Sequence, residues 1–211
     1  MKKFGNTTYS YNAQNVRFKK TVGEVITEYV HDGGKLLAET EYKNITDAYG
    51  LPDRKYIRER VYFYDLEGIV GFGSDTLRYN YVKDAFDNVV SIVYNNQELA
   101  RYSYDAFGKC KVLNPDGTEN TEPTFIGNLN PIRWKSLYYD VESGLYYIDG
   151  RYYSPETRQF LSPLPAETMF SNALTVFGLN PYLITLYNCV NRLYKKLKIF
   201  SHKKISIKRL A

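Results

Sequence analysis

Apolar and polar residues alternate in short runs along most of residues 1–163, and Gly, Asp, Asn and Pro separate the runs. The runs at 25–27, 36–38 and 89–94 are apolar and β-branched, and each follows a polar turn. Alternation with a period of two places one face of a strand in the interior and the other in water. The pattern predicts a mainly β protein built from antiparallel hairpins.

One phrase recurs five times: Tyr, any residue, Tyr or a substitute, Asp or Asn, and then Gly or Asn within four residues. Its first tyrosines, separated by 20, 33, 19 and 21 residues, are Tyr9, Tyr29, Tyr62, Tyr81 and Tyr102. Tyr-x-Tyr places two rings on one face of a strand, while Asp and Gly suit the turn that follows. Stacked hairpins bury each other's faces and edges. We therefore expect a continuous antiparallel sheet that curls or spirals, with an inserted loop at 45–55.

Residues 134–163 form a second, Tyr-rich stretch, WKSLYYDVESGLYYIDGRYYSPETRQFLSP, with six tyrosines between Tyr138 and Tyr153. Such a density of rings favours a sheet over a solvated loop, because the rings cover its faces. The predicted order is strand, turn, strand, bend, strand, turn and strand. The strands end at 139, span 145–148 and 151–153, and return at 160–161; the first turn is 140–144.

The motifs of this stretch resemble the core segment of the Rhs (YD-repeat) family. They are Asn130-Pro131, Arg133-Trp134, Tyr138-Tyr139-Asp140, Gly144-Leu145-Tyr146-Tyr147, Arg151-Tyr152-Tyr153, Pro155 and Phe160-Leu161-Ser162-Pro163. The recurring phrase is similar to the YD repeat of the same family, so the resemblance covers residues 7–163. It implies a β-strand spiral that builds a hollow shell, with the core segment closing one end. Five repeats imply a curved, Rhs-like shell fragment.

Structural roles are expected for the residues that carry the core motif. These are Tyr138, Tyr139, Asp140, Gly144, Leu145, Tyr146, Tyr147, Arg151, Tyr152, Tyr153, Pro155 and Phe160.

The net charge of +5 is unevenly distributed, since eight Lys or Arg residues follow the last acidic residue, Glu167. Residues 166–177 have the pattern of a short amphipathic helix, and 183–190 suit either a strand or a helix. The basic tail after 191 fits a solvated end, a membrane-surface helix or a contact with nucleic-acid phosphates. This reversal of charge favours three parts: repeats at 1–125, the core segment at 126–163 and a degenerate basic segment at 164–211.

The resemblance also implies a self-cleaving pair of aspartates after the core segment. Leu164 stands where the first aspartate is usual, and no carboxylate follows Glu167, so such a pair cannot be assembled. His31 and His202 are isolated, and Cys110 and Cys189 form no disulfide framework. We expect no catalytic, cofactor-binding or metal-binding residue.

The four aspartates of the YD phrases occur one per turn, which predicts turn closure rather than metal binding. They are Asp65, Asp84, Asp105 and Asp140.

These features predict a non-enzymatic structural fragment of an Rhs-type protein, a shell or scaffold of a bacterial polymorphic toxin or cell-surface protein. The alternatives are a polymorphic-toxin-related effector and a carbohydrate- or protein-binding surface module. Expected partners are other YD-repeat segments or an enclosed polypeptide, with weak membrane-surface or nucleic-acid contact through the tail, and no small-molecule substrate. The family implies a secreted or cell-surface location. The amino terminus lacks the apolar stretch of a signal peptide, and we expect Met1 to lie inside what was once a longer chain.

Overall fold

The computed structural model describes residues 2–163 and 182 of the 211-residue chain. The chain divides into two compact units, Met1–Gly150 and Arg151–Ala211. The helix expected at 166–177, the apolar run at 183–190 and the basic tail lie outside the described residues.

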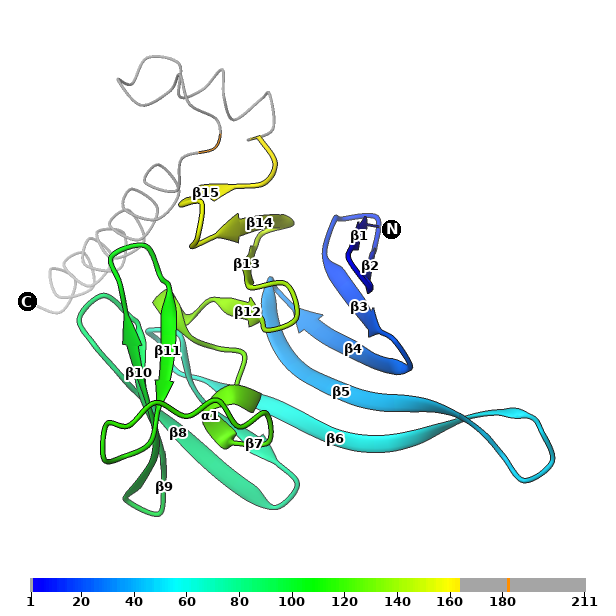
Figure 1. The fold of residues 1–211 in the computed structure, drawn as a ribbon, viewed down its shortest axis with the longest axis horizontal. Coiled ribbons are helices and arrows are strands. Elements are labelled where there is room, and N and C mark those ends of the chain that lie inside the picture. Colours follow the sequence, from blue (N-terminus) through cyan, green and yellow to red (C-terminus); the bar gives the residue numbers. More distant parts are fainter. Residues whose placement is uncertain (1, 164–181, 183–211) are drawn as a thin grey trace, which may run out of the picture. The chain divides into compact units, whose positions relative to one another are not determined.

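The first unit contains an eleven-stranded sheet in which the spatial order of the strands is their order in the sequence (Figure 1). All neighbouring strands are antiparallel. The mainly antiparallel β fold expected from the alternating pattern is therefore confirmed. The strands are β1 (Lys2–Phe4), β2 (Thr7–Tyr11), β3 (Arg17–Val22), β4 (Val25–Asp32), β5 (Lys35–Thr46), β6 (Pro52–Tyr64), β7 (Ile69–Ser74), β8 (Leu77–Lys83), β9 (Val89–Tyr94), β10 (Gln97–Tyr104) and β11 (Cys110–Leu113).

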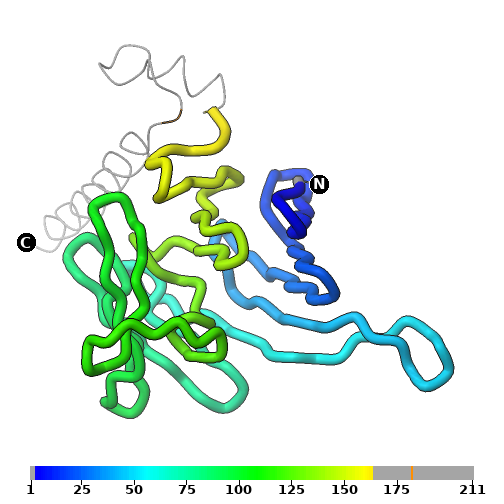
Figure 2. Tube along the Cα trace, viewed as in Figure 1, coloured from blue at the N-terminus to red at the C-terminus, as the bar shows by residue number. Residues whose placement is uncertain are grey.

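Because the sheet is a simple meander, alternate turns lie on opposite rims, as the trace in Figure 2 allows the reader to follow. Each YD phrase ends an even-numbered strand, so the five YD turns share one rim, which we call the YD rim. It consists of the turns at 12–16, 33–34, 65–68, 84–88 and 105–109.

The YD turns close as their sequence predicts. Asp65 Oδ1 accepts hydrogen bonds from the backbone amides of Glu67 and Gly68, at 2.7 and 2.9 Å. Asp84 and Asp105 close their turns in the same way. Such local bonds offer the backbone a fixed turn and leave the strands on either side in register.

The prediction of an inserted loop at 45–55 is wrong, because most of these residues belong to paired strands. β5 and β6 pair as far as Thr46 and Pro52, so that only residues 47–51 form a turn. Asp47 Oδ1 accepts hydrogen bonds from the amides of Tyr49 and Leu51, at 2.9 and 2.7 Å. The extra residues lengthen one hairpin, which projects beyond the neighbouring strands in Figure 1.

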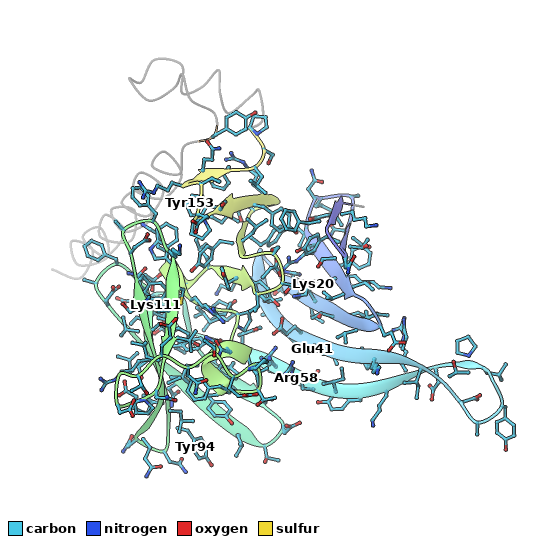
Figure 3. The ribbon with its side chains drawn as sticks, in the orientation of Figure 1. Lys20, Glu41, Arg58, Tyr94, Lys111 and Tyr153 are labelled. Carbon is cyan, nitrogen blue, oxygen red and sulfur yellow. The ribbon has the colours of Figure 1, made fainter. Side chains whose placement is uncertain are left out.

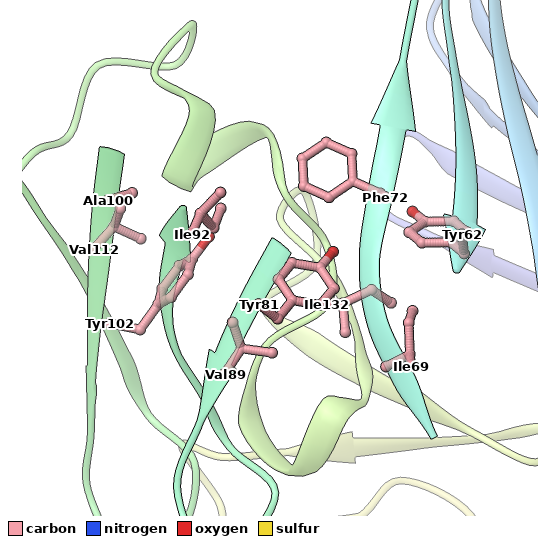
Figure 4. Close-up of a cluster of buried hydrophobic side chains, with 10 residues drawn as sticks. All are labelled: Tyr62, Ile69, Phe72, Tyr81, Val89, Ile92, Ala100, Tyr102, Val112 and Ile132. Atoms are coloured by element: carbon pink, nitrogen blue, oxygen red, sulfur yellow. The ribbon is translucent and has the colours of Figure 1, made fainter. Parts of the chain in front are cut away.

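The main hydrophobic core of the first unit lies against β6 to β11 (Figure 4). Phe72 and Tyr79 stack there with ring centroids 4.8 Å apart. Its ten buried residues are Tyr62, Ile69, Phe72, Tyr81, Val89, Ile92, Ala100, Tyr102, Val112 and Ile132.

The chain after β11 returns across the first unit as α1 (Ile126–Leu129), a 3₁₀ turn (Trp134–Ser136), β12 (Tyr138–Asp140) and β13 (Leu145–Ile148). β12 and β13 pair as a hairpin, in which Tyr138 is opposite Tyr147. The predicted strand at 145–148 is present, and the predicted turn begins one residue later, because Asp140 still belongs to β12.

The described part of the second unit is the hairpin of β14 (Arg151–Ser154) and β15 (Gln159–Phe160). Arg151 Nη2 donates to the Ser162 carbonyl at 2.6 Å, and its guanidinium lies 3.6 Å from the centroid of the Phe160 ring. Tyr153 meets the same ring edge to face, at 5.7 Å. These contacts join both strands of the hairpin to the chain that follows it.

Candidate functional site: the closing segment on the YD rim

Residues 126–148, which we call the closing segment, contact turns of the YD rim. The backbone amide of Lys135 donates to Asn88 Oδ1 at 2.9 Å, and Ser136 Oγ donates to the Asp87 carbonyl at 2.9 Å. The Val89 amide donates to the Arg133 carbonyl at 3.2 Å. The turn after β8 is thus bound by backbone and side-chain groups of a segment about fifty positions away in the sequence.

Gly108, in the turn after β10, is a point of close approach between the rim and the closing segment. A Cβ atom at this position would lie 2.5 Å from Trp134 Cδ2, and the Gly108 φ angle of +90° also disfavours any L side chain. Tyr146 Oη donates to the Gly108 carbonyl at 2.9 Å. The glycine of this YD turn therefore serves two purposes, the turn itself and the seat of the Trp134 ring.

Asn130 fixes the start of the closing segment over the hydrophobic core. Tyr81 Oη donates to Asn130 Oδ1 at 2.6 Å, and Asn130 Nδ2 donates to the Ile132 carbonyl at 2.7 Å. Nδ2 also donates to Tyr102 Oη at 3.1 Å. Since Asn130 is fully buried, these bonds satisfy an amide that would be costly to bury unpaired. Two tyrosines of the YD phrases, Tyr81 and Tyr102, thereby hold the segment.

The opposite end of the closing segment is held by buried charges. Arg17 Nη1 lies 2.5 Å from Asp140 Oδ2, and these two side chains are 2% and 0% exposed. Lys20 Nζ lies 3.3 Å from Asp140 Oδ1 and 2.8 Å from Glu142 Oε1. We call Arg17, Lys20, Asp140 and Glu142 the charged clasp; Figure 3 labels Lys20 on β3. It joins β3 to β12 and the turn after it.

Four tyrosine rings surround the Arg17 guanidinium. The guanidinium carbon lies 4.5 Å from the ring centroid of Tyr147, 4.7 Å from Tyr29, 4.8 Å from Tyr138 and 5.3 Å from Tyr9. A desolvated guanidinium over tyrosine faces gains cation–π attraction in addition to its ion pair. Burial alone lowers the pKa of Lys20, but the nearby Tyr29, Asp140 and Glu142 oxygens outweigh it and raise that pKa.

A second buried carboxylate, Glu39 on β5, extends the polar network. Glu39 Oε1 lies 2.5 Å from Arg60 Nη1 and accepts from Tyr62 Oη at 2.9 Å, while Oε2 accepts from Tyr138 Oη at 2.5 Å. Tyr138 therefore links the charged clasp to the Glu39 network, since its ring faces Arg17 and its hydroxyl binds Glu39.

Glu41 continues the network along β5, 3.1 Å from Arg60 and 2.8 Å from Arg58 (Figure 3). Burial raises the pKa of Glu41, yet the hydrogen bond and charge of Arg58 and the charge of Arg60 outweigh it and lower that pKa.

Asp140 was expected to close a turn with its side chain, and the structure shows that it does not. Its backbone carbonyl closes the turn by accepting from the Gly144 amide at 2.8 Å, while its carboxylate binds Arg17. Arg17 was not predicted as its partner, because nothing in the sequence links Arg17 to Asp140, 123 positions further along the chain. The one signal in the sequence that could have identified Arg17 is its position as a basic residue at the start of a strand between two tyrosine-containing strands.

Every carboxylate of this site lies beside a cation, so the arrangement suits holding two segments together rather than transferring protons. Within residues 2–163 and 182, no group of three His, Cys, Asp or Glu side chains is placed to hold a metal ion. The same part of the chain has no helix long and apolar enough to cross a membrane. That the core-motif residues are structural, and that the chain has no cofactor-binding residue, stays a prediction.

Alkaline pH is expected to unfold the protein. Burial, and then the Glu39 carboxylate, raise the pKa of Tyr62 and Tyr138 well above 10.0, and burial raises that of Tyr29 to about 12. Above pH ~10 the unfolded chain loses tyrosine and lysine protons that the folded chain keeps. The unfolded state then binds fewer protons, so the free energy of unfolding falls as pH rises.

Absorbance of tyrosinate, followed together with circular dichroism from about pH 8 upward, tests this expectation. The buried tyrosines should ionise in one cooperative step, together with loss of the sheet signal. Smooth ionisation of all tyrosines near pH ~10 with the sheet intact would contradict it.

No family model matches the sequence. It is similar to three curated bacterial proteins. The tRNA3(Ser)-specific nuclease WapA of Bacillus spizizenii is 33% identical over 156 residues, 74% of this chain and 6% of the relative. The tRNA nuclease WapA of Bacillus subtilis is 32% identical over 164 residues, again 74% and 6%. The tRNA(Glu)-specific nuclease WapA of Bacillus subtilis subsp. natto is 30% identical over 185 residues, 83% and 7%. The chain thus spans a small fraction of these relatives.

Two solved structures share the fold. The TcdB2-TccC3-TEV structure has a TM-score of 0.54 and 14% identity, over 87% of this chain and 8% of that one. TcdB2-TccC3 without its hypervariable C-terminal region has a TM-score of 0.52 and 12% identity, over 88% of this chain and 10% of that one. The protein has an Rhs-like β fold, and its relatives at higher identity are the WapA nucleases named above.

These findings correct two expectations. A non-enzymatic structural fragment and the absence of enzymatic activity were both expected, and both are contradicted by relatives that are named tRNA nucleases. The first alternative, a polymorphic-toxin-related effector, accounts for the relatives better. The expectation failed because the missing aspartate pair concerns self-cleavage, and its loss carries no information about a separate nuclease activity.

Proposed function

We propose that the chain belongs to the YD-repeat family of polymorphic toxins and acts as a nuclease effector with tRNA as its substrate. The observation that carries this proposal is the identity of 30 to 33% with three tRNA nucleases over 74 to 83% of the chain. The Rhs-like fold supports it, because the structural similarity extends over 87 to 88% of the chain rather than one short motif.

Within such an effector, we assign the YD sheet and the closing segment the task of enclosing or associating with other polypeptide segments. The buried clasp and the Asn130 network support this role, because they fasten a remote part of the chain to the YD rim. We also propose that the chain has domain boundaries at 125 and 163. The structural role of the core-motif residues is part of the same proposal. So are secretion or cell-surface display, and a tail that contacts nucleic-acid phosphates or a membrane surface.

Incubation of the purified chain with total tRNA, followed by separation on a denaturing gel, tests the activity. The proposal predicts discrete tRNA fragments whose amount grows with time and with protein concentration. Intact tRNA at protein concentrations equal to that of the substrate would contradict it.

Two controls guard against a contaminating nuclease. Material from cells without the gene, carried through the same columns, should leave tRNA intact. The cut position should also be the same in preparations of different purity, because a specific nuclease cleaves at a fixed site whereas trace contaminants degrade tRNA throughout.

A further inference from the structure

The closing segment bridges strands from both ends of the first unit's sheet. Near the last strands it contacts Gly108 and Asn88, and near the first strands it contacts Arg17 and Lys20. Tyr147 Oη extends the second contact by accepting from the Arg17 backbone amide at 3.1 Å. The segment therefore acts as a strap across the sheet.

The attachment at the last strands is extensive and combines hydrogen bonds with apolar packing. Ile132 belongs to the hydrophobic core, Trp134 covers Gly108, and a Cβ at Gly127 would lie 2.6 Å from Val112 Cγ1. Apolar packing of this kind is spread over many atoms, so loss of one contact leaves the others in place.

The attachment at the first strands has a different character. The buried hydrophobic side chains of β1 to β4 are Tyr9, Ile26 and Tyr29, and both tyrosines face the Arg17 guanidinium. Both rings therefore pack against one buried cation, whose carboxylate partner is Asp140. A buried charge that loses its partner is strongly destabilising, so these contacts fail together.

We propose that the charged clasp is the release point of the strap: β1 to β4 detach from the closing segment as one unit while β7 to β11 keep it. Detached strands lose the cover of their inner face, and Ile26 is the one further buried hydrophobic side chain described on them, which makes them the less stable part of the sheet. This opening does not depend on the nuclease activity.

Hydrogen exchange of the full chain, followed by mass spectrometry, tests this proposal. In the unaltered protein, amides of β2 to β4 should exchange together and at least about tenfold faster than those of β8 to β10. Asp140→Asn should bring β2 to β4 within about tenfold of the rate of an unstructured chain, while β8 to β10 keep at least about hundredfold protection.

Equal exchange rates in the two groups of strands, in the unaltered protein and in the variant, would overturn the proposal. Arg17→Lys keeps the positive charge but loses the paired donors of the guanidinium, and should give an intermediate exchange rate in β2 to β4. If Asp140→Asn does not fold, this milder variant decides the question, and unchanged exchange in β2 to β4 then counts against the clasp.

Discussion

Asp140→Asn is expected to lower the free energy of unfolding by about 3–5 kcal/mol, a large share of the ~5–15 kcal/mol of a typical domain. Asparagine nearly matches aspartate in shape, so packing is conserved and the change removes a charge. Arg17, 2% exposed, is then left in the interior beside a neutral group. The desolvation of a guanidinium without its counter-ion accounts for the size of the loss. Urea unfolding of both proteins by circular dichroism measures it.

A matched control comes from an ion pair at the surface. Lys43 Nζ lies 3.2 Å from Glu24 Oε2, and these side chains are 50% and 69% exposed. Glu24→Gln should cost less than about 1 kcal/mol, because water screens both charges. Similar losses in the two variants would show that the burial of the clasp contributes nothing to stability, and the predicted role of Asp140 would then be wrong.

Gly108→Ala is expected to destabilise the protein by about 2–5 kcal/mol, and it should loosen the closing segment. The new Cβ would lie 2.5 Å from Trp134 Cδ2, so the indole has to move away from the turn. Such overpacking costs about 1–3 kcal/mol. The φ angle of +90° adds the strain of a left-handed conformation, about 1–2 kcal/mol. Urea unfolding gives the total, and the shift of Trp134 fluorescence reports exposure of the ring.

Gly117→Ala separates the two causes. Gly117 has the same φ angle of +90°, and a Cβ there meets nothing within 4 Å. This variant should therefore show the backbone strain alone and leave Trp134 fluorescence unchanged. Equal destabilisation by both substitutions would mean that Trp134 does not rest on the turn.

The repeats allowed the sheet to be predicted because their signals are local. Tyr-x-Tyr alternation marks a strand face, and the aspartate that follows marks the turn, so β6 to β10 could be placed from the sequence. The projecting hairpin of β5 and β6 was predicted to be a loop, and the cause of this error also lies in neighbouring residues. Asp47 makes residues 47–51 a compact turn, and the flanking residues, charged and polar, look like a loop although they pair as strands.

The candidate site could be predicted only in part. The motif residues of the closing segment were recognised, and Asp140 was among them, but its partner was not. Arg17 and Asp140 meet because the closing segment returns from the last strand of the sheet to the first strands, and this depends on the path of the whole chain rather than on neighbouring residues. The same holds for Asn88 and Gly108, whose signals in the sequence are those of ordinary turns. Likewise, the charge pattern alone gave no sign of a nuclease.

The state of the tRNA pool in cells that produce the chain tests the proposed function most directly. After induction, tRNAs are separated on a denaturing gel and probed one species at a time. We predict that one or a few species are cut at a defined position while other RNAs stay intact and growth stops. An unchanged tRNA pool in cells that contain the soluble, folded chain would contradict the proposed nuclease activity.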